Sequence, residues 1–257
     1  MKKYTAKDFE TFERDGRGWI VCPSGDYTEI RKFPKICKFG DGSVFSDGTR
    51  FDDDCIFGKG CTFGEGSIFG EENIFDEGCS FEERSVFDEE STFGAGCTFG
   101  ERSRFGARST FGARSRFGAR SRFGEWSSFG RGSIFSELSR FGEECSFESK
   151  SRFGDKNIFG DGCEFGRECR FSSWNTFGKW SNFGKEVKFI DGNGFDKESS
   201  FDNKCTFKYL NVFEEKCTFG ENSKFGDRNL FGNECVIGAG STFGKDNKFG
   251  EDVTMED

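Results

Sequence analysis

A phenylalanine recurs at every sixth residue from Phe33 to Phe249, and no insertion or deletion interrupts this frame. The one exception is Ile237, and only Phe9 and Phe12 of the 38 phenylalanines lie outside the frame. A unit of six residues is too short for a helical repeat, but it fits a short strand followed by a corner. The chain is therefore predicted to be a stack of such units, each of which buries its apolar face against its neighbours.

The other positions of the unit indicate how it is oriented. With Phe as position 1, position 5 is almost always Ser, Cys, Asn or Thr, and position 2 is Gly in 23 of 37 units. Because strand side chains alternate between the two faces, positions 5 and 1 are expected to point inward and position 6 outward. We expect the glycine at position 2 to supply backbone conformations that the corner needs and that other residues resist.

The cysteines indicate how many units make one turn. Eleven of the twelve lie at position 5, and several are eighteen residues apart, as in Cys61, Cys79 and Cys97. Sorting position 5 by eighteen gives one column without cysteine, which ends in six consecutive asparagines from Asn157 to Asn247. The predicted fold is all-β: a single-stranded parallel β-helix solenoid with three hexapeptides, or 18 residues, per coil and about twelve coils. Its rings would stack in three inward columns, and its asparagines would form an amide ladder.

The pattern Phe-Gly-x-x-[Ser/Cys/Asn]-x resembles the hexapeptide repeat of left-handed parallel β-helices, whose usual core residue is Leu, Ile or Val. The resemblance covers residues 33 to 250 and implies a left-handed coil. Enzymes of that family, acyltransferases and γ-class carbonic anhydrases, use histidine as a base or metal ligand. This chain has no histidine, so we expect no catalytic residue and no enzymatic activity.

Three regions are expected along the chain. Residues 1–32 would form an N-terminal cap, with a helix in 6–14 and an extended segment at 18–22. Residues 33–250 would form the β-helix, and 251–257 an acidic C-terminal tail.

No segment resembles a signal peptide or a membrane span, which predicts a cytoplasmic protein with reduced cysteines and no membrane partner. The absence of Cys-x-x-Cys spacing and of histidine predicts no metal site, and no cofactor is expected.

Charge is distributed unevenly along the chain. The net charge of −9 argues against binding to DNA or RNA. Fifteen acidic residues lie between Asp41 and Phe99, whereas nine arginines lie between Gly100 and Arg140. The eighteen-residue period places some of these arginines beside aliphatic residues and a tryptophan on one outward strip. The candidate binding residues of this Arg/apolar strip are Arg84, Arg102, Arg104, Arg120, Arg122, Arg140, Ile68, Val86, Ile158 and Trp174.

Several functions fit these features. The leading hypothesis is a non-enzymatic binding or scaffold protein that presents the Arg/apolar strip to a protein partner or to its own copy. A second is an acidic inhibitor that mimics DNA, as pentapeptide-repeat solenoids do, and blocks a DNA-handling or host-defence enzyme. A third is a protein that sequesters a nucleotide or phosphate anion, which the arginines of the strip would bind. If Glu83, Glu101 and Glu137 compensate the arginines, the strip would instead be an ordinary solvated face.

Overall fold

The computed structural model describes residues 1–257, which divide into two compact units, unit 1 (Met1–Gly130) and unit 2 (Arg131–Asp257). In each unit the chain winds through three short strands per coil, and strands 18 residues apart pair in parallel, as Phe87 does with Phe105. This pairing produces three faces, named I, II and III in chain order from Lys32. The chain is thus a parallel β-solenoid with 18-residue coils, as the sequence predicted.

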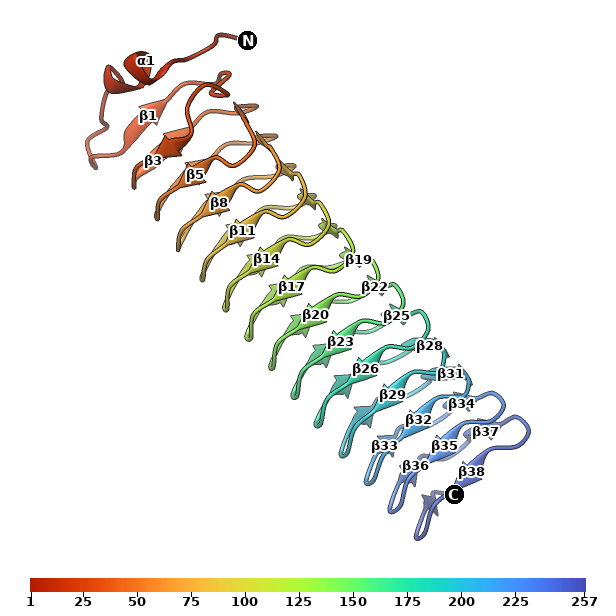
Figure 1. Ribbon diagram of the computed structural model, residues 1–257. Helices are drawn as coiled ribbons and strands as arrows, with labels where there is room; N and C mark the ends of the chain where they lie inside the picture. Colours follow the sequence, from red (N-terminus) through yellow and green to blue (C-terminus); the bar gives the residue numbers. More distant parts are fainter. The chain divides into compact units, whose positions relative to one another are not determined.

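Most strands of unit 1 contain only the residue at position 6 and the following Phe. They appear as short arrows on successive coils (Figure 1). Face I contains β2 (Lys32–Phe33), β5 (Arg50–Phe51), β8 (Ile68–Phe69), β11 (Val86–Phe87), β14 (Arg104–Phe105) and β17 (Arg122–Phe123). Face II contains β1 (Ile20–Cys22), β3 (Cys37–Phe39), β6 (Ile56–Phe57), β9 (Ile74–Phe75), β12 (Thr92–Phe93), β15 (Thr110–Phe111) and β18 (Ser128–Phe129). Face III contains β4 (Val44–Phe45), β7 (Thr62–Phe63), β10 (Ser80–Phe81), β13 (Thr98–Phe99) and β16 (Arg116–Phe117).

Unit 2 repeats the same arrangement. Face I contains β20 (Arg140–Phe141), β23 (Ile158–Phe159), β26 (Thr176–Phe177), β29 (Gly194–Phe195), β32 (Val212–Phe213), β35 (Leu230–Phe231) and β38 (Lys248–Phe249). Face II contains β21 (Ser146–Phe147), β24 (Glu164–Phe165), β27 (Asn182–Phe183), β30 (Ser200–Phe201), β33 (Thr218–Phe219), β36 (Val236–Ile237) and β39 (Thr254–Met255). Face III contains β19 (Ile134–Phe135), β22 (Arg152–Phe153), β25 (Arg170–Phe171), β28 (Lys188–Asp191), β31 (Thr206–Tyr209), β34 (Lys224–Phe225) and β37 (Thr242–Phe243).

The phenylalanine rings fill the interior in three stacked columns, as predicted. The ring of Phe111 lies 4.9 Å from that of Phe93 and 4.9 Å from that of Phe129, with planes within 1° of parallel. It meets Phe105 and Phe117 edge to face, with centroids 5.0 Å apart. Each ring therefore stacks along its own column and makes edge contacts with the other two, and both are favoured geometries for aromatic pairs.

The small residues at position 5 are buried beside the rings, and the asparagines form the predicted ladder. In unit 2, the backbone N–H of Asn175 donates to Oδ1 of Asn193 at 3.0 Å, and the N–H of Asn193 donates to Oδ1 of Asn211 at 3.1 Å. The side-chain amides continue the chain, since Nδ2 of Asn175 donates to Oδ1 of Asn193 at 3.1 Å. Buried amides are thus satisfied from coil to coil rather than by solvent.

The glycine at position 2 has a different role at the corners from the one predicted. The positive φ occurs at position 4, where Gly96 has φ 71° but Arg84 has 59° and Trp174 has 62°. The glycines at position 2 have ordinary φ, so the predicted conformational reason is wrong. They are needed for close approach: a Cβ on Gly112 would lie 2.5 Å from the backbone N of Ala95 in the preceding coil.

This packing predicts opposite outcomes for two glycine substitutions. Gly112→Ala should lower the free energy of unfolding by about 1–2 kcal/mol, because two coils must move apart to admit the methyl group. Gly194→Ala should leave it unchanged or raise it by less than about 1 kcal/mol, since nothing lies within 4 Å of its Cβ position and its φ is ordinary. Urea midpoints followed by circular dichroism measure both, and equal midpoints would contradict the close-approach explanation.

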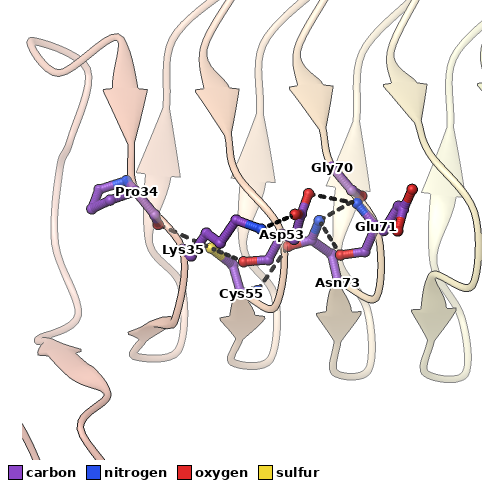
Figure 2. Close-up of polar contacts among 7 residues, drawn as sticks. All are labelled: Pro34, Lys35, Asp53, Cys55, Gly70, Glu71 and Asn73. Atoms are coloured by element: carbon purple, nitrogen blue, oxygen red, sulfur yellow. Dashed lines mark hydrogen bonds and ion pairs between the residues drawn. The ribbon is translucent and has the colours of Figure 1, made fainter.

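Polar contacts at the corners tie each coil to the next (Figure 2). Oδ1 of Asp53 accepts from the backbone N–H of Glu71 at 3.1 Å, and its carboxylate also pairs with Lys35 of the preceding coil. Oδ1 of Asn73 accepts from the N–H of Cys55 at 2.9 Å. A short polar residue at positions 3 or 5 therefore satisfies a backbone donor eighteen residues away.

The N-terminal segment differs in detail from the expectation. The helix α1 (Ala6–Glu10) is shorter than the predicted 6–14; Thr5 and Asp8 form a capping box at its start, and Thr11 caps its end. The extended segment predicted at 18–22 contains β1. The ring of Tyr27 stacks on that of Phe45 at 5.4 Å and so occupies the column one coil earlier.

The last residues of unit 2 also pair with the solenoid. Within 251–257, β39 pairs with β36, and Thr254 lies beside Val236. Thirteen strands recur at 18-residue intervals from β2 to β38, against about twelve coils expected.

Candidate functional site

The unit 1 part of the Arg/apolar strip lies on face I. Strand pairing places Ile68 beside Val86, Val86 beside Arg104, and Arg104 beside Arg122. All four side chains point outward; Ile68, Arg104 and Arg122 are exposed, and Val86 is half-buried. Neighbouring strands are about 4.8 Å apart, so the two guanidinium groups project side by side from adjacent coils, next to an aliphatic pair.

Three further arginines of the strip occupy the corner between faces III and I in unit 1. Arg84, Arg102 and Arg120 have φ of 59°, 59° and 60°, and all three are exposed. Arg84 forms an ion pair with Glu65, whose Oε1 lies 2.5 Å from its Nη1. Arg102 and Arg120 form no ion pair. The five arginines of the strip in unit 1 form the arginine cluster. Only Arg84 among them forms an ion pair, so most of the cluster keeps its charge uncompensated.

The three acids that could compensate the strip do not pair with its arginines. Glu83, Glu101 and Glu137 form no ion pair with any arginine, and the partner of Arg84 is Glu65, nineteen residues before it. The alternative of compensation by these three acids is not supported, since the acid that pairs with Arg84 lies in the preceding coil, at the same place in the corner as Glu83.

The remaining members of the strip belong to unit 2. On face I, Arg140 lies beside Ile158, and Ile158 lies beside Thr176. Trp174 stands on the corner between β25 and β26, and its ring packs against Gly192, where a Cβ would lie 2.7 Å from the ring. The structure therefore places this tryptophan next to face III as well as face I.

The acidic coils of unit 1 are cross-linked by ion pairs at the surface. Nζ of Lys59 lies 3.3 Å from Oε2 of Glu77. Arg108 reaches back to two carboxylates, that of Glu89 at 2.6 Å and that of Glu90 at 2.8 Å. Such exposed pairs add little to stability, but they reduce the uninterrupted negative charge that a DNA mimic would need.

The cysteines are buried free thiols. Burial raises the pKa of both Cys169 and Cys205 to about 12, so neither is a thiolate at neutral pH, the form that attacks substrates or binds metals. Their Sγ atoms instead donate to backbone carbonyls, as Cys205 does to Gly184 at 3.5 Å. No three His, Cys, Asp or Glu side chains come together as a metal site.

A second charged feature, absent from the sequence prediction, lies on face III of unit 2. A groove of about 390 Å³ runs across β22, β25, β28 and β31. Its charged lining residues are Arg152, Arg170, Lys188 and Lys208, which together define the basic groove. No carboxylate lines it. The sequence does indicate this groove, because the basic residues at 152, 170 and 188 are eighteen residues apart and therefore share one face.

The grooves on the other faces have a different character. The one on face II of unit 2 contains Glu148, Glu164 and Asp202, and the one on face I of unit 2 contains Asp196 and Glu214. On face II of unit 1, a groove combines Lys38 with Asp41 and Asp76. The same fold thus produces acidic or mixed grooves in these places, so the basic character of the face III groove follows from its own residues.

Comparison with known proteins identifies no family. No protein-family model and no curated protein matches this chain. Two solved structures of the Streptococcus pneumoniae surface adhesin PfbA are similar in fold. One aligns over 100% of both chains with a TM-score of 0.39 and 10% identity. The other aligns over 91% of this chain and 84% of that chain, with a TM-score of 0.33 and 8% identity. No helix in the present structure is long and apolar enough to cross a membrane.

Proposed function

We propose that this protein is a non-enzymatic binding scaffold whose unit 1 strip binds an acidic protein surface. The observation that carries the proposal is the register of Arg104 and Arg122 on face I, both exposed, without ion pairs and adjoining Ile68 and Val86. Arginine beside exposed aliphatic residues is typical of the centres of protein interfaces. A solvated surface gains nothing from unpaired like charges at strand spacing.

A second copy of the same chain is the partner that the charges favour. The coils between residues 41 and 99 carry fifteen acids against three basic residues, and they belong to the same molecule as the arginine cluster. Complementary patches of this kind speed association and fix its register. Self-association would therefore pair the acidic coils of one molecule with the strip of another.

Reversal of two charges on the strip tests this proposal. In Arg104→Glu/Arg122→Glu, the dimer dissociation constant should rise at least about tenfold, because two central contacts become repulsive. Light scattering at increasing protein concentration, at low and high salt, measures it. Arg114→Glu/Arg116→Glu is the matched control, since it makes the same change of charge outside the strip. A wild-type chain that stays monomeric at low salt, or an equal loss in the control, would contradict the proposal.

A further inference from the structure

The basic groove holds a concentration of positive charge that the protein leaves unneutralised. Strand pairing places Arg152 beside Arg170 and Arg170 beside Lys188, and Lys208 lines the same groove from the next coil. All four side chains are exposed, and none forms an ion pair. Cations on adjacent strands repel each other unless an anion lies between them. The groove is therefore complementary to a ligand with several negative charges.

The regular repeat changes at this groove. β28 and β31 each extend over four residues, whereas most strands have two, and their extra residues pair Asp191 with Tyr209. Position 2, which is glycine in most coils, is occupied there by Ile190 and Lys208, and both side chains line the groove. The departure from the repeat thus adds an apolar contact and a cation to the same place.

Aromatic side chains stand at the corner beside the groove. Trp174 follows the groove-lining Ser172 by two residues and is 57% exposed. Tyr209 follows the groove-lining Lys208 and is 49% exposed. Exposed rings beside cations suit a ligand that combines phosphate groups with a planar ring, since such rings stack on tryptophan and tyrosine.

We propose that the basic groove binds a nucleoside polyphosphate, with its phosphates on Arg152, Arg170 and Lys188 and its base against Trp174. Arginine binds phosphate oxygens in a bidentate manner, which suits Arg152 and Arg170 for the phosphate groups. The volume of about 390 Å³ lies in the range of small-ligand sites. The net charge of −9 disfavours a long polyanion. The site shares no residue with the unit 1 strip, so the two proposals stand or fall separately.

Calorimetric titration with ATP, inorganic triphosphate and adenosine separates the two parts of the site. ATP and triphosphate should both bind with a stoichiometry of one, and ATP about tenfold more tightly because its base stacks. Arg170→Glu/Lys188→Glu should weaken both ligands at least about tenfold. Trp174→Ala should reduce ATP to the affinity of triphosphate and leave triphosphate unchanged. Circular dichroism establishes that each variant keeps its fold.

Matched controls and adverse outcomes complete the test. Arg114→Glu/Arg116→Glu and Trp126→Ala make the same change of charge and the same loss of a ring in unit 1, and they should leave ATP binding intact. An equal loss in these controls would mean nonspecific attraction and would overturn the proposal, as would the absence of saturable binding by ATP and triphosphate. Tighter binding of a single-stranded oligonucleotide than of ATP would overturn it in favour of a nucleic-acid site.

Discussion

Phe111→Ala is expected to lower the free energy of unfolding by about 3–5 kcal/mol, the range for removing a buried aromatic ring. The ring is 2% exposed and lies between two other rings of its column in unit 1. Its removal leaves Phe93 and Phe129 without the partner between them and deprives Phe105 and Phe117 of an edge contact. The coils are joined by backbone hydrogen bonds on either side and cannot close over the gap, so a cavity remains.

Urea or thermal unfolding monitored by circular dichroism measures this loss, and two variants calibrate it. Thr110→Ala alters the adjacent outward residue and should change stability by less than about 0.5 kcal/mol. Phe249→Ala removes a ring that is 41% exposed, and its effect should be clearly smaller than that of Phe111→Ala. If the two phenylalanine variants unfold at the same midpoint, the stacked interior is not the source of stability.

Asn193→Ala is expected to lower the free energy of unfolding by about 3–4 kcal/mol, because it leaves a buried donor without its acceptor and creates a small cavity. Oδ1 of Asn193 accepts from both the backbone and the side chain of Asn175, at 3.0 and 3.1 Å. Its own Nδ2 donates to Oδ1 of Asn211 at 3.1 Å. The substitution therefore interrupts the ladder in both directions.

The control is an asparagine of the same unit that lies outside the ladder. Asn182 is exposed on face II, and Asn182→Ala should change stability by less than about 0.5 kcal/mol. Hydrogen exchange adds a local readout, since the amide of Asn175 should exchange faster in Asn193→Ala while distant core amides change less. Unchanged exchange at Asn175 would contradict the role assigned to the ladder.

The fold could be predicted from the sequence because one residue type marks every coil. The spacing of phenylalanine defined the inward columns, and the asparagines at 157–247 defined the three-unit turn. The reason for glycine at position 2 could not be predicted, because it depends on how closely the backbone of Gly112 approaches Ala95 in another coil. Tyr27 was missed as a member of a ring column because the frame was counted from phenylalanine alone.

The candidate site was less accessible to sequence reasoning. The alignment of Arg104 with Arg122 follows from the eighteen-residue period and is present in the structure. The partner of Arg84 does not follow from it, since the side chain reaches into the preceding coil to Glu65. The basic groove was not predicted from the sequence, although Arg152, Arg170 and Lys188 are eighteen residues apart. Long flexible side chains are the part of a regular repeat that periodicity alone does not place.

The interior of this solenoid repeats every six residues, whereas its outer columns repeat every eighteen, and the difference affects how such a chain can evolve. Duplication or loss of one whole coil lengthens or shortens the array and keeps every downstream residue on its face. Duplication of one hexapeptide preserves the phenylalanine frame but moves each downstream outward residue to the next face, and it takes the asparagines out of line. Growth by whole coils is therefore the route that preserves a binding surface while the length of the protein changes.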